Sequence, residues 1–331
     1  MYLLLPITSF VLTLVLLEAF FRIDVLARIQ DIPNERSLHE RPVPRIGGLA
    51  LMAGALAAFA IQPSQIVRTL LVPTLFLIAV SVIDDIRGLS AGWRLFAHIA
   101  AATLFAVKVF LPTFGWSVPV LVVLAIVWMT NLYNFMDGSD GLAGGMTLIG
   151  FSAYGVVGLM HDNTSFALLC FCIAASALAF LRYNFSPARV FMGDAGSIPL
   201  GFLAAALGLI GWQDDFWPAW FPVLVFSPFV IDASVTLLKR FVRGDRIADA
   251  HKEHYYQRLV QMGWVHKKTA IGEYMLMVSV GCSAVWAISV PPLQQFVLIG
   301  AWVAIYFAAF TVIDIRWSKH SPRRSAVAGR K

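Results

Sequence analysis

Residues 131–145 read Asn131-Leu-Tyr-Asn134-Phe-Met-Asp137-Gly138-Ser-Asp140-Gly141-Leu-Ala-Gly-Gly145 and join two apolar runs, 118–133 and 145–160, without a soluble spacer. Two carboxylates and two carboxamides therefore lie at the edge of an apolar layer, where they are costly unless they meet partners or water. The glycines allow tight turns and let a ligand approach backbone N–H groups. The stretch predicts a functional site; the alternative is a polar interhelical loop built on Asp-Gly turns.

The composition around this stretch excludes a soluble domain. Of the 331 residues, 59% are hydrophobic and only 13% are charged, which is too few charges for a water-exposed surface. We predict an all-α polytopic membrane protein with about eleven transmembrane helices, or ten if short neighbouring runs merge. The apolar runs are 2–21, 46–62, 69–83, 95–111, 118–133, 145–160, 165–182, 197–212, 219–238, 270–290 and 294–315.

Loop charge predicts the orientation. If the N-terminus is periplasmic, the cytoplasmic loops hold all of the 25 Lys and Arg residues except Arg68 and Lys108, as the positive-inside rule requires. The C-terminus is then cytoplasmic, and so is every long polar loop. We expect one transmembrane catalytic domain, 1–315, with its active site on the cytoplasmic face, and a basic cytoplasmic tail, 316–331.

Acids recur at this predicted face. Asp84-Asp85-Ile-Arg87 ends the third apolar run, and Phe191-Met-Gly193-Asp194 precedes the eighth. Adjacent carboxylates repel each other, so a metal, a nearby cation or a shared proton usually holds them together. Carboxylate oxygens suit Mg²⁺, with Mn²⁺ as a substitute, and such an arrangement is what phosphoryl transfer needs. The acids in question are Asp84, Asp85, Asp137, Asp140 and Asp194.

Two basic loops accompany the acids. The loop 22–48 carries Arg36, His39 and Arg45, which could hold phosphate, although topology alone would also make this loop basic. The loop 239–268 carries Arg246, His251, His254 and Arg258. On a helix the last three would share one face, which favours a phosphate clamp over a zinc site.

Taken in order, these motifs resemble the polyprenyl-phosphate N-acetylhexosamine-1-phosphate transferases. The resemblance runs from about Pro33 to Arg258 and rests on four motifs: Asp84-Asp85, Asn131-x-x-Asn134-x-x-Asp137-Gly-x-Asp140-Gly-Leu, Phe191-Met-Gly-Asp194-Ala-Gly-Ser, and His251-x-x-His254. It implies that UDP-HexNAc and undecaprenyl phosphate give undecaprenyl-diphosphate-HexNAc and UMP, with Mg²⁺, in the bacterial inner membrane. A homodimer is one option, and no nucleic-acid partner is expected.

The resemblance also implies residue roles. Asp194 resembles the residue that binds the metal on the diphosphate, Phe191 the aromatic that stacks on uracil, and Gly138 to Asp140 the turn that holds the uridine. Asp84 and Asp85 resemble the pair nearest the lipid phosphate; we assign Asp84 as base and count both as metal ligands. Supporting or substrate-binding positions are Asn131, Asn134, Asp137, Arg36, His39, Arg45, Arg246 and Arg258, with His251 and His254 counted as catalytic.

Two departures refine the subfamily. The last loop lacks the run of adjacent histidines of the phospho-MurNAc-pentapeptide transferases, and Arg87 stands where the family can have a lysine. We therefore expect a transferase that initiates O-antigen or another surface polysaccharide and uses GlcNAc or a 6-deoxy-HexNAc. The alternatives are the MurNAc-pentapeptide transferase and, in another class, a secondary transporter or a structural subunit.

Overall fold

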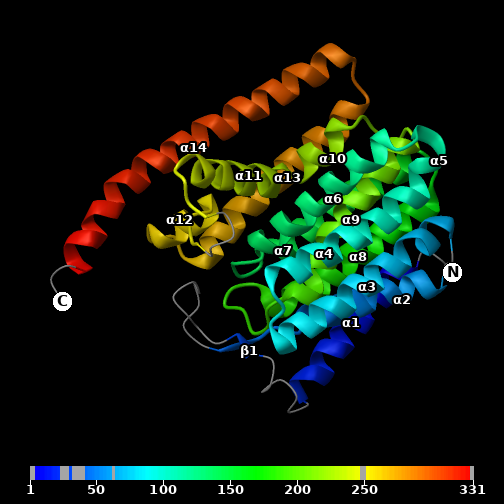
Figure 1. The fold of residues 1–331 in the computed structure, drawn as a ribbon, viewed down its shortest axis with the longest axis horizontal. Helices are drawn as coiled ribbons and strands as arrows, with labels where there is room; N and C mark the ends of the chain where they lie inside the picture. The colour runs from blue at the N-terminus through cyan, green and yellow to red at the C-terminus, as the bar shows by residue number, and fades with distance from the viewer. Residues whose placement is uncertain (1–3, 23–29, 32–41, 62–63, 247–250, 329–331) are drawn as a thin grey trace.

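The computed structural model describes residues 4–22, 30–31, 42–61, 64–246 and 251–328, nearly all of them helical (Figure 1). A short hairpin of two strands interrupts the helices, with Gln30 opposite Pro44 and Asp31 opposite Val43. In chain order the elements are α1 (Leu5–Arg22), β1 (Gln30–Asp31), β2 (Val43–Pro44), α2 (Gly47–Ile61), α3 (Gln65–Arg87), α4 (Ala91–Val109), α5 (Leu111–Phe114), α6 (Ser117–Met136), α7 (Leu142–Met160), α8 (Thr164–Asn184), α9 (Asp194–Gln213), α10 (Trp220–Val225), α11 (Ser227–Val242), α12 (Tyr255–Gln261), α13 (His266–Ile288) and α14 (Pro292–Ala328).

The helices agree with the predicted all-α membrane class. Within the described residues, each of the eleven predicted apolar runs is mostly helical, and eight helices are long and apolar enough to cross a membrane: α1, α3, α6, α7, α8, α9, α13 and α14. The helix α2 is apolar but shorter. The molecule is therefore a multi-pass membrane protein.

One predicted run does not form a single helix. The run 219–238 divides at Phe226 into α10 and α11. Pro228 lies in the first turn of α11, where its missing N–H is tolerated, whereas in the interior of a continuous helix it would remove a hydrogen bond. The prediction of one spanning helix here was wrong because proline outweighed the apolar pattern.

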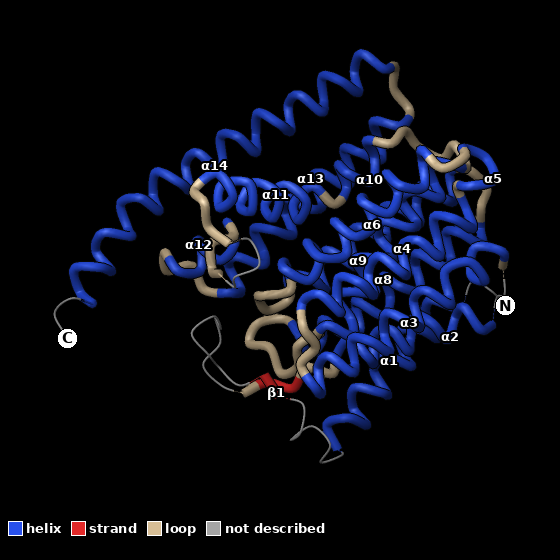
Figure 2. The backbone as a smooth tube through the Cα atoms, viewed as in Figure 1, coloured by secondary structure: helices blue, strands red, loops and turns tan. Residues whose placement is uncertain are grey.

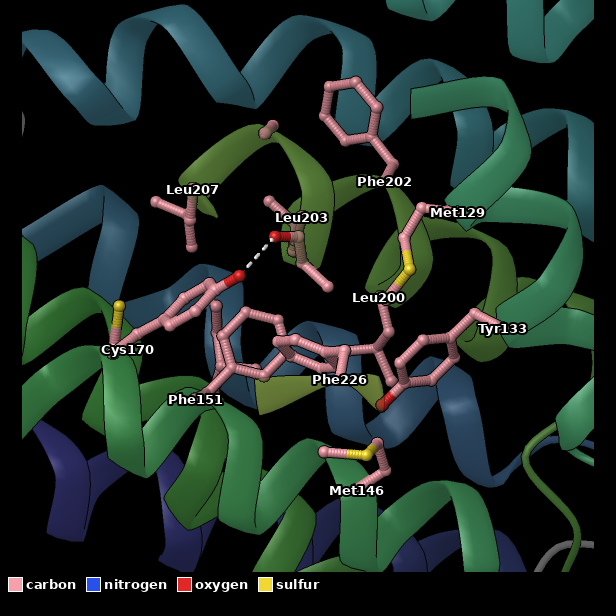
Figure 3. Close-up of a cluster of buried hydrophobic side chains, with 14 of the residues drawn as sticks. Met129, Tyr133, Met146, Phe151, Cys170, Leu200, Phe202, Leu203, Leu207 and Phe226 are labelled. Atoms are coloured by element: carbon pink, nitrogen blue, oxygen red, sulfur yellow. Dashed lines mark hydrogen bonds between the residues drawn. The ribbon is translucent and has the colours of Figure 1, made fainter. Parts of the chain in front are cut away.

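The helix α9 forms the centre of the bundle. In its apolar window 83% of residues are buried, compared with 6% in α14, which runs along the outside (Figure 1). Around α9 lie large side chains of α6, α7 and α8, including Tyr133 and Phe151 (Figure 3). The buried tyrosine hydroxyls keep partners: Tyr154 donates to the Ala204 carbonyl at 3.1 Å, and Tyr133 lies 2.7 Å from the Thr147 hydroxyl. These bonds avoid the cost of unpaired polar groups in the core.

Glycines bring α2 against the start of α9. Gly48 N–H donates to the Met192 carbonyl at 2.9 Å, and a Cβ added to Gly48 would lie 2.5 Å from the Gly196 Cα. Gly47 N–H similarly donates to the Phe191 carbonyl at 2.9 Å. Only residues without a Cβ allow this approach, so this pair of glycines sets where α9 begins.

The polar loops gather at one end of the bundle, away from α5 and the labelled N-terminus (Figure 2). There the C-terminal ends of α3 and α6 meet the N-terminal ends of α2 and α9. The helix α14 continues through the predicted boundary at 315/316 to Ala328. The structure thus places the predicted motifs of four separate segments at one end.

The Gly48 contact yields a stability prediction. Gly48→Ala forces the added methyl group against the backbone of Gly196, so we expect a loss of about 1–3 kcal/mol in stability, the usual cost of overpacking. The measurement is the thermal unfolding midpoint in detergent. Gly300→Ala is the control, because a Cβ there meets no atom within 4 Å. Equal midpoints for the two variants would contradict the packing argument.

Candidate active site

Three acids from two helices form the centre of the polar end. Asp84 and Asp85 lie in the last turn of α3, and Asp194 is the first residue of α9. The Ala195 N–H donates to Asp85 Oδ2 at 3.4 Å, which joins the two helix ends directly. A helix N-terminus favours the charge of Asp194, but a C-terminus disfavours those of Asp84 and Asp85. The pair on α3 is therefore held at an energetic cost.

Asp137 adds a fourth carboxyl. It follows the last residue of α6 and is half-buried. Burial, followed by the charges of Asp194 and Asp85, raises the pKa of Asp137 well above its usual value, although Arg45 and the Gly193 N–H act in the opposite direction. This residue therefore holds a proton more readily than a free aspartate does, because burial and two neighbouring negative charges disfavour its ionised form.

Arg94, one of two arginines that face these acids, lies in the first turn of α4, with its Nη1 3.5 Å from Asp84 Oδ2 and 3.8 Å from Asp194 Oδ2. Arg45 lies beside β2, where it pairs with Asp31 at 2.8 Å and acts electrostatically on Asp85 and Asp137. If all four carboxyls are ionised, these two arginines of the described residues cannot neutralise them, because Arg45 also pairs with Asp31. The remaining charge suits a divalent cation.

The segment between α8 and α9 positions Asp194. Gly193 adopts a positive φ of 71° directly before it, and a Cβ there would lie 2.6 Å from the Arg45 carbonyl. Asn184 supports the segment from α8, accepting from the Gly141 N–H at 3.0 Å and donating to the Val190 carbonyl at 2.9 Å. On the other side, Ser197 donates to Asn134 Oδ1 at 2.7 Å. The two asparagine-containing motifs are thus linked by hydrogen bonds.

The geometry is typical of a centre that binds phosphate with help from a cation. In the described part of the chain, no group of three or more His, Cys, Asp or Glu side chains converges to form an all-protein metal site. The donor chemistry nonetheless fits Mg²⁺, which commonly takes one or two carboxylates and completes its octahedron with water and substrate phosphates. Arginine side chains beside such a cation can hold further phosphate oxygens.

Comparison with known proteins identifies the family of the chain. A family model described as glycosyl transferase family 4 matches residues 67–218. A Bacillus subtilis (strain 168) protein named probable undecaprenyl-phosphate N-acetylglucosaminyl 1-phosphate transferase is 30% identical over 287 residues, 82% of this chain and 80% of that protein. The chain belongs to glycosyl transferase family 4.

Other relatives of this family 4 enzyme agree on the reaction class. A decaprenyl-phosphate N-acetylglucosaminephosphotransferase of Mycobacterium leprae is 30% identical over 289 residues, 73% of each chain. A phospho-N-acetylmuramoyl-pentapeptide-transferase of Listeria welshimeri is 34% identical over 154 residues, 45% of each chain. The chain is a polyprenyl-phosphate sugar-1-phosphate transferase, which confirms the predicted family and decides against the transporter hypothesis.

The sequence of this family 4 enzyme grouped Asp140 with four other acids, but in the structure Asp140 has a separate set of contacts. Asp140 is buried, and its Oδ2 accepts from the Ala188 N–H at 3.1 Å. It therefore fixes the 185–190 segment. The neighbouring Gly138 packs under the Tyr256 hydroxyl, which a Cβ would approach to 2.2 Å.

The last predicted loop differs from expectation. The helix α12 begins at Tyr255, so His251 and His254 precede it and do not share a helix face with Arg258. His254 caps the helix and is buried, with its Nδ1 3.4 Å from Asp232 Oδ1. The carboxylate of Asp232 also accepts the N–H groups of Tyr255 and Tyr256 at 2.9 and 3.1 Å. The predicted single helix face was wrong because Asp232, on α11, fixes the start of α12 after the histidines.

His251 and Arg258 have specific surroundings. Burial, with the adjacent His254 and Arg240, lowers the pKa of His251 to about 4, so this imidazole is neutral at physiological pH. Arg258 is buried and its Nη1 lies 2.7 Å from Asp314 on α14. The structure therefore shows Arg258 paired with an acid of its own chain.

The remaining predicted residues are dispersed. Arg36 and His39 lie outside the described residues. Arg246 is exposed, and Asn131 donates to the Val127 carbonyl of its own helix at 2.7 Å. Phe191 is half-buried and its N–H donates to the Pro44 carbonyl at 2.8 Å, which places it beside Arg45. Sequence reasoning missed Arg94; its position, ten residues after Asp84 at the start of the next apolar run, was the available signal.

The raised pKa of Asp137 gives a prediction for stability against pH. Because the folded pKa lies above the unfolded one, the folded state loses stability as pH rises from about 4 towards the folded pKa. Asp137→Asn removes this cost, so we expect its thermal midpoint to exceed the parent's at pH 8 and the difference to shrink at pH 5. Turnover should fall at least about tenfold, as expected when a charged group in an active site is lost.

Asp140→Asn is the control for this comparison. It retains an acceptor for the Ala188 N–H and lies outside the acid cluster of Asp84, Asp85, Asp137 and Asp194, so no pH-dependent gain is expected. A lower midpoint for Asp137→Asn than for the parent at pH 8 would contradict the charge-repulsion argument.

Proposed function

We propose that the protein transfers HexNAc-1-phosphate from a UDP-HexNAc donor to undecaprenyl phosphate, giving undecaprenyl-diphosphate-HexNAc and UMP. The observation that carries this proposal is the acid cluster with its two arginines, which lies at the end of a membrane bundle in a family 4 enzyme. Two relatives that align over most of this chain are named for N-acetylglucosamine-1-phosphate transfer to a prenyl phosphate.

The proposed step is a direct displacement. An oxygen of the lipid phosphate attacks the phosphorus that carries the sugar, the bond from that phosphorus to the oxygen of UMP breaks, and UMP leaves with the electron pair. The attacking and departing groups are both anionic, so the reaction depends on positioning and charge neutralisation. Arg45 and Arg94 supply fixed positive charge next to the acids.

The contacts favour Asp85 over Asp84 as the base. Asp84 accepts the Leu89 N–H at 2.6 Å through Oδ1, and its Oδ2 lies 3.5 Å from Arg94. Both oxygens of Asp84 are thus engaged. Asp85 is held less tightly, by backbone N–H groups at the start of α9: the bond from Ala195 is long at 3.4 Å, and the Asp194 N–H acts on the same carboxylate. In this proposal Asp85 takes the proton of a lipid monophosphate monoanion, and Asp84 orients Arg94.

We propose Mg²⁺ as the cofactor, with Mn²⁺ as a substitute. Asp194 would hold it with help from Asp137, and bound Mg²⁺ supplies neutralisation of the diphosphate charge. The excess of acids over arginines in the cluster supports this assignment. Protons held by the cluster, above all on Asp137, would be released as the cation binds, because metal binding requires deprotonated ligands.

An apolar cavity of about 190 Å³ offers a place for part of the prenyl chain. It is lined by α6, α9, α10 and the start of α11, including Trp128, Leu132, Pro222 and Phe226. Leu132 precedes Asp137 by five residues, about 7.5 Å along a helix. A lipid whose phosphate meets the acid cluster could therefore place hydrocarbon in this cavity.

For the donor we propose GlcNAc or a 6-deoxy-HexNAc, used to initiate O-antigen or a related surface polysaccharide at the cytoplasmic face of a bacterial inner membrane. The names of the two long-matching relatives support GlcNAc. Tyr255 and Tyr256 begin α12, and their contacts within the protein do not favour a role in choosing the donor sugar. Tyr255 stacks on Phe310 with ring centroids 3.6 Å apart, and the Tyr256 hydroxyl donates to the Phe135 carbonyl at 3.3 Å.

A donor panel tests the reaction. Purified protein in detergent, given undecaprenyl phosphate and one of UDP-GlcNAc, UDP-GalNAc, UDP-N-acetylfucosamine or UDP-MurNAc-pentapeptide, should release UMP fastest with UDP-GlcNAc or the 6-deoxy sugar. The measurement is UMP by chromatography, with the lipid omitted as control. Preference for the pentapeptide donor would support the MurNAc-pentapeptide alternative, and no release from folded protein with any donor would refute the proposal.

A chelation experiment tests the cofactor. Activity should vanish with EDTA and return with Mg²⁺ or Mn²⁺, and Asp194→Asn should lose about 100-fold or more in kcat, the scale of one lost electrostatic contact at a transition state. Titration of Mg²⁺ should also shift the thermal midpoint of the parent more than that of Asp194→Asn. An Asp194→Asn enzyme with near-parental kcat would refute the metal assignment.

A further inference from the structure

The helix α14 contacts the rest of the protein through both apolar and polar side chains. Trp302 Nε1 donates to Ser283 Oγ at 3.0 Å, and Tyr306 lies 2.7 Å from the Ser227 hydroxyl. Asp314 is the sole acid in the sequence of this helix, which otherwise presents apolar side chains on most of its surface. A lone carboxylate in such a helix is costly unless it has partners.

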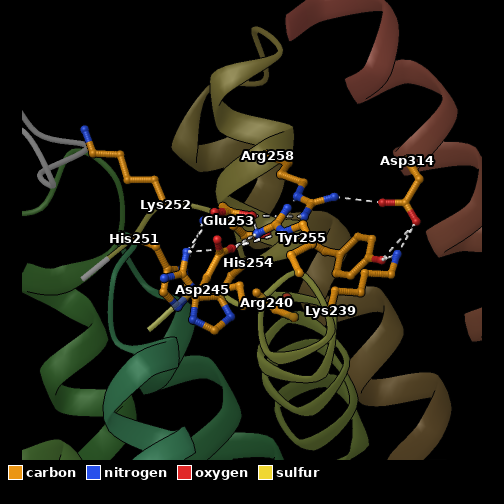
Figure 4. Close-up of polar contacts among 12 residues, drawn as sticks. Lys239, Arg240, Asp245, His251, Lys252, Glu253, His254, Tyr255, Arg258 and Asp314 are labelled. Carbon is orange, nitrogen blue, oxygen red and sulfur yellow. Dashed lines mark hydrogen bonds and ion pairs between the residues drawn. The ribbon is translucent and has the colours of Figure 1, made fainter. Parts of the chain in front are cut away.

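Asp314 has three partners at the polar end, drawn in Figure 4. Its Oδ1 accepts from Arg258 at 2.7 Å, and its Oδ2 accepts from the Tyr255 hydroxyl at 3.1 Å and from Lys239. The Lys239 ammonium also donates to the Tyr255 hydroxyl at 2.6 Å. We call these four residues the Asp314 cluster. It joins α11, α12 and α14, whose sequence positions lie up to 75 residues apart.

From this cluster the contacts lead into the loop before α12. Arg258 Nε donates to the Glu253 carbonyl at 2.8 Å. The Glu253 carboxylate accepts from Arg240 at 2.8 Å and from Arg243 at 2.5 Å. The Glu253 N–H in turn donates to His251 Nδ1 at 3.3 Å. One continuous chain of hydrogen bonds thus runs from α14 to His251.

The loop also contacts the end of α6, which leads to Asp137 of the acid cluster. The rings of His251 and His254 lie 4.9 Å apart, and those of His254 and Phe135 lie 6.4 Å apart. Tyr256 reaches the Phe135 carbonyl at 3.3 Å, two residues before Asp137. Residues 251–258 therefore lie between α14 and the turn that carries Asp137, and a shift of α12 would move this turn.

We infer that Asp314 is a positioning residue for the reaction, a step that rests on the proposed function. It orients Arg258, and through Arg258 it fixes Glu253 and His251. In this inference the sugar of the nucleotide donor lies against residues 251–258, because this segment adjoins Phe135 and the turn that carries Asp137. The loop is polar, and the imidazole of His251 is uncharged. Such a side chain suits hydrogen bonding to hydroxyl and acetamido groups rather than ion pairing. The lipid acceptor approaches from the apolar side and is not expected to sense the Asp314 cluster directly.

The kinetic test compares Asp314→Asn with Thr311→Ala. Thr311 lies one turn earlier on α14, is exposed and bonds only its own helix, through the Phe307 carbonyl at 2.7 Å. We expect Asp314→Asn to raise KM for the UDP-sugar about tenfold, the factor for one lost charged hydrogen bond. KM for undecaprenyl phosphate should remain within about twofold, and Thr311→Ala should match the parent. Asp314→Glu, which keeps the charge, should recover most of the donor affinity.

A double-mutant cycle tests whether Asp314 acts through Arg258. If it does, Asp314→Asn should add little to the loss caused by Arg258→Gln, because residues acting in series are not additive. Additive losses in kcat/KM for the donor would overturn the proposed route. Equal losses for donor and lipid, in proportion to a fall in folded protein, would show a purely structural role and overturn the inference.

Hydrogen–deuterium exchange gives a readout that does not depend on turnover. Asp314→Asn should speed amide exchange in residues 251–258, whereas Thr311→Ala should leave it unchanged. Faster exchange in Asp314→Asn, together with a parent enzyme that fails with every donor, would mean that the contact chain is real and the proposed function is wrong. Unchanged exchange in Asp314→Asn would overturn the inference even if the enzyme is active.

Discussion

The rest of the structure depends on the cost of gathering four carboxyls at the end of an apolar bundle. Asp84 and Asp85 lie at the C-terminal end of α3, where the helix dipole disfavours negative charge. Burial and acidic neighbours raise the pKa of Asp137. Favourable packing free energy elsewhere in the protein must offset this cost. The core around α9, with its interlocked aromatic and small side chains, is the source, and it holds the helix ends where repulsion would otherwise separate them.

Backbone contacts fix the geometry of the cluster more firmly than side-chain pairs do. The N–H groups of Gly47 and Gly48 donate to the carbonyls of Phe191 and Met192, and the positive φ of Gly193 then turns the chain into α9. Asp194 therefore begins a helix whose position is set by α2. The arginines contribute charge, but Arg94 lies 3.5 and 3.8 Å from Asp84 and Asp194, distances of loose ion pairs.

The sequence predicted most of the fold and about half of the site for identifiable reasons. Apolar runs locate helices because backbone groups inside a membrane must form their hydrogen bonds within the protein. The acid motifs lie next to the ends of these runs in the sequence. Three features could not be read in this way. The break at Phe226 arises from proline geometry, the start of α12 is set by Asp232 from another helix, and Arg94 faces the acids only after α3 and α4 pair. The last two depend on tertiary contacts between helices, whereas the break was encoded locally by Pro228.

The same reasoning explains why the loop before α12 was misassigned while its chemistry was recognised. His251 and His254 do come close, with rings 4.9 Å apart, but the carboxylate of Asp232 takes the first N–H groups of α12 and forces the helix to begin after them. Arg258 is then turned away, towards Asp314, a residue that follows the recognised motifs by more than fifty positions. A helix without any motif of its own thereby becomes part of the catalytic end, because an acid in an apolar helix must be paired.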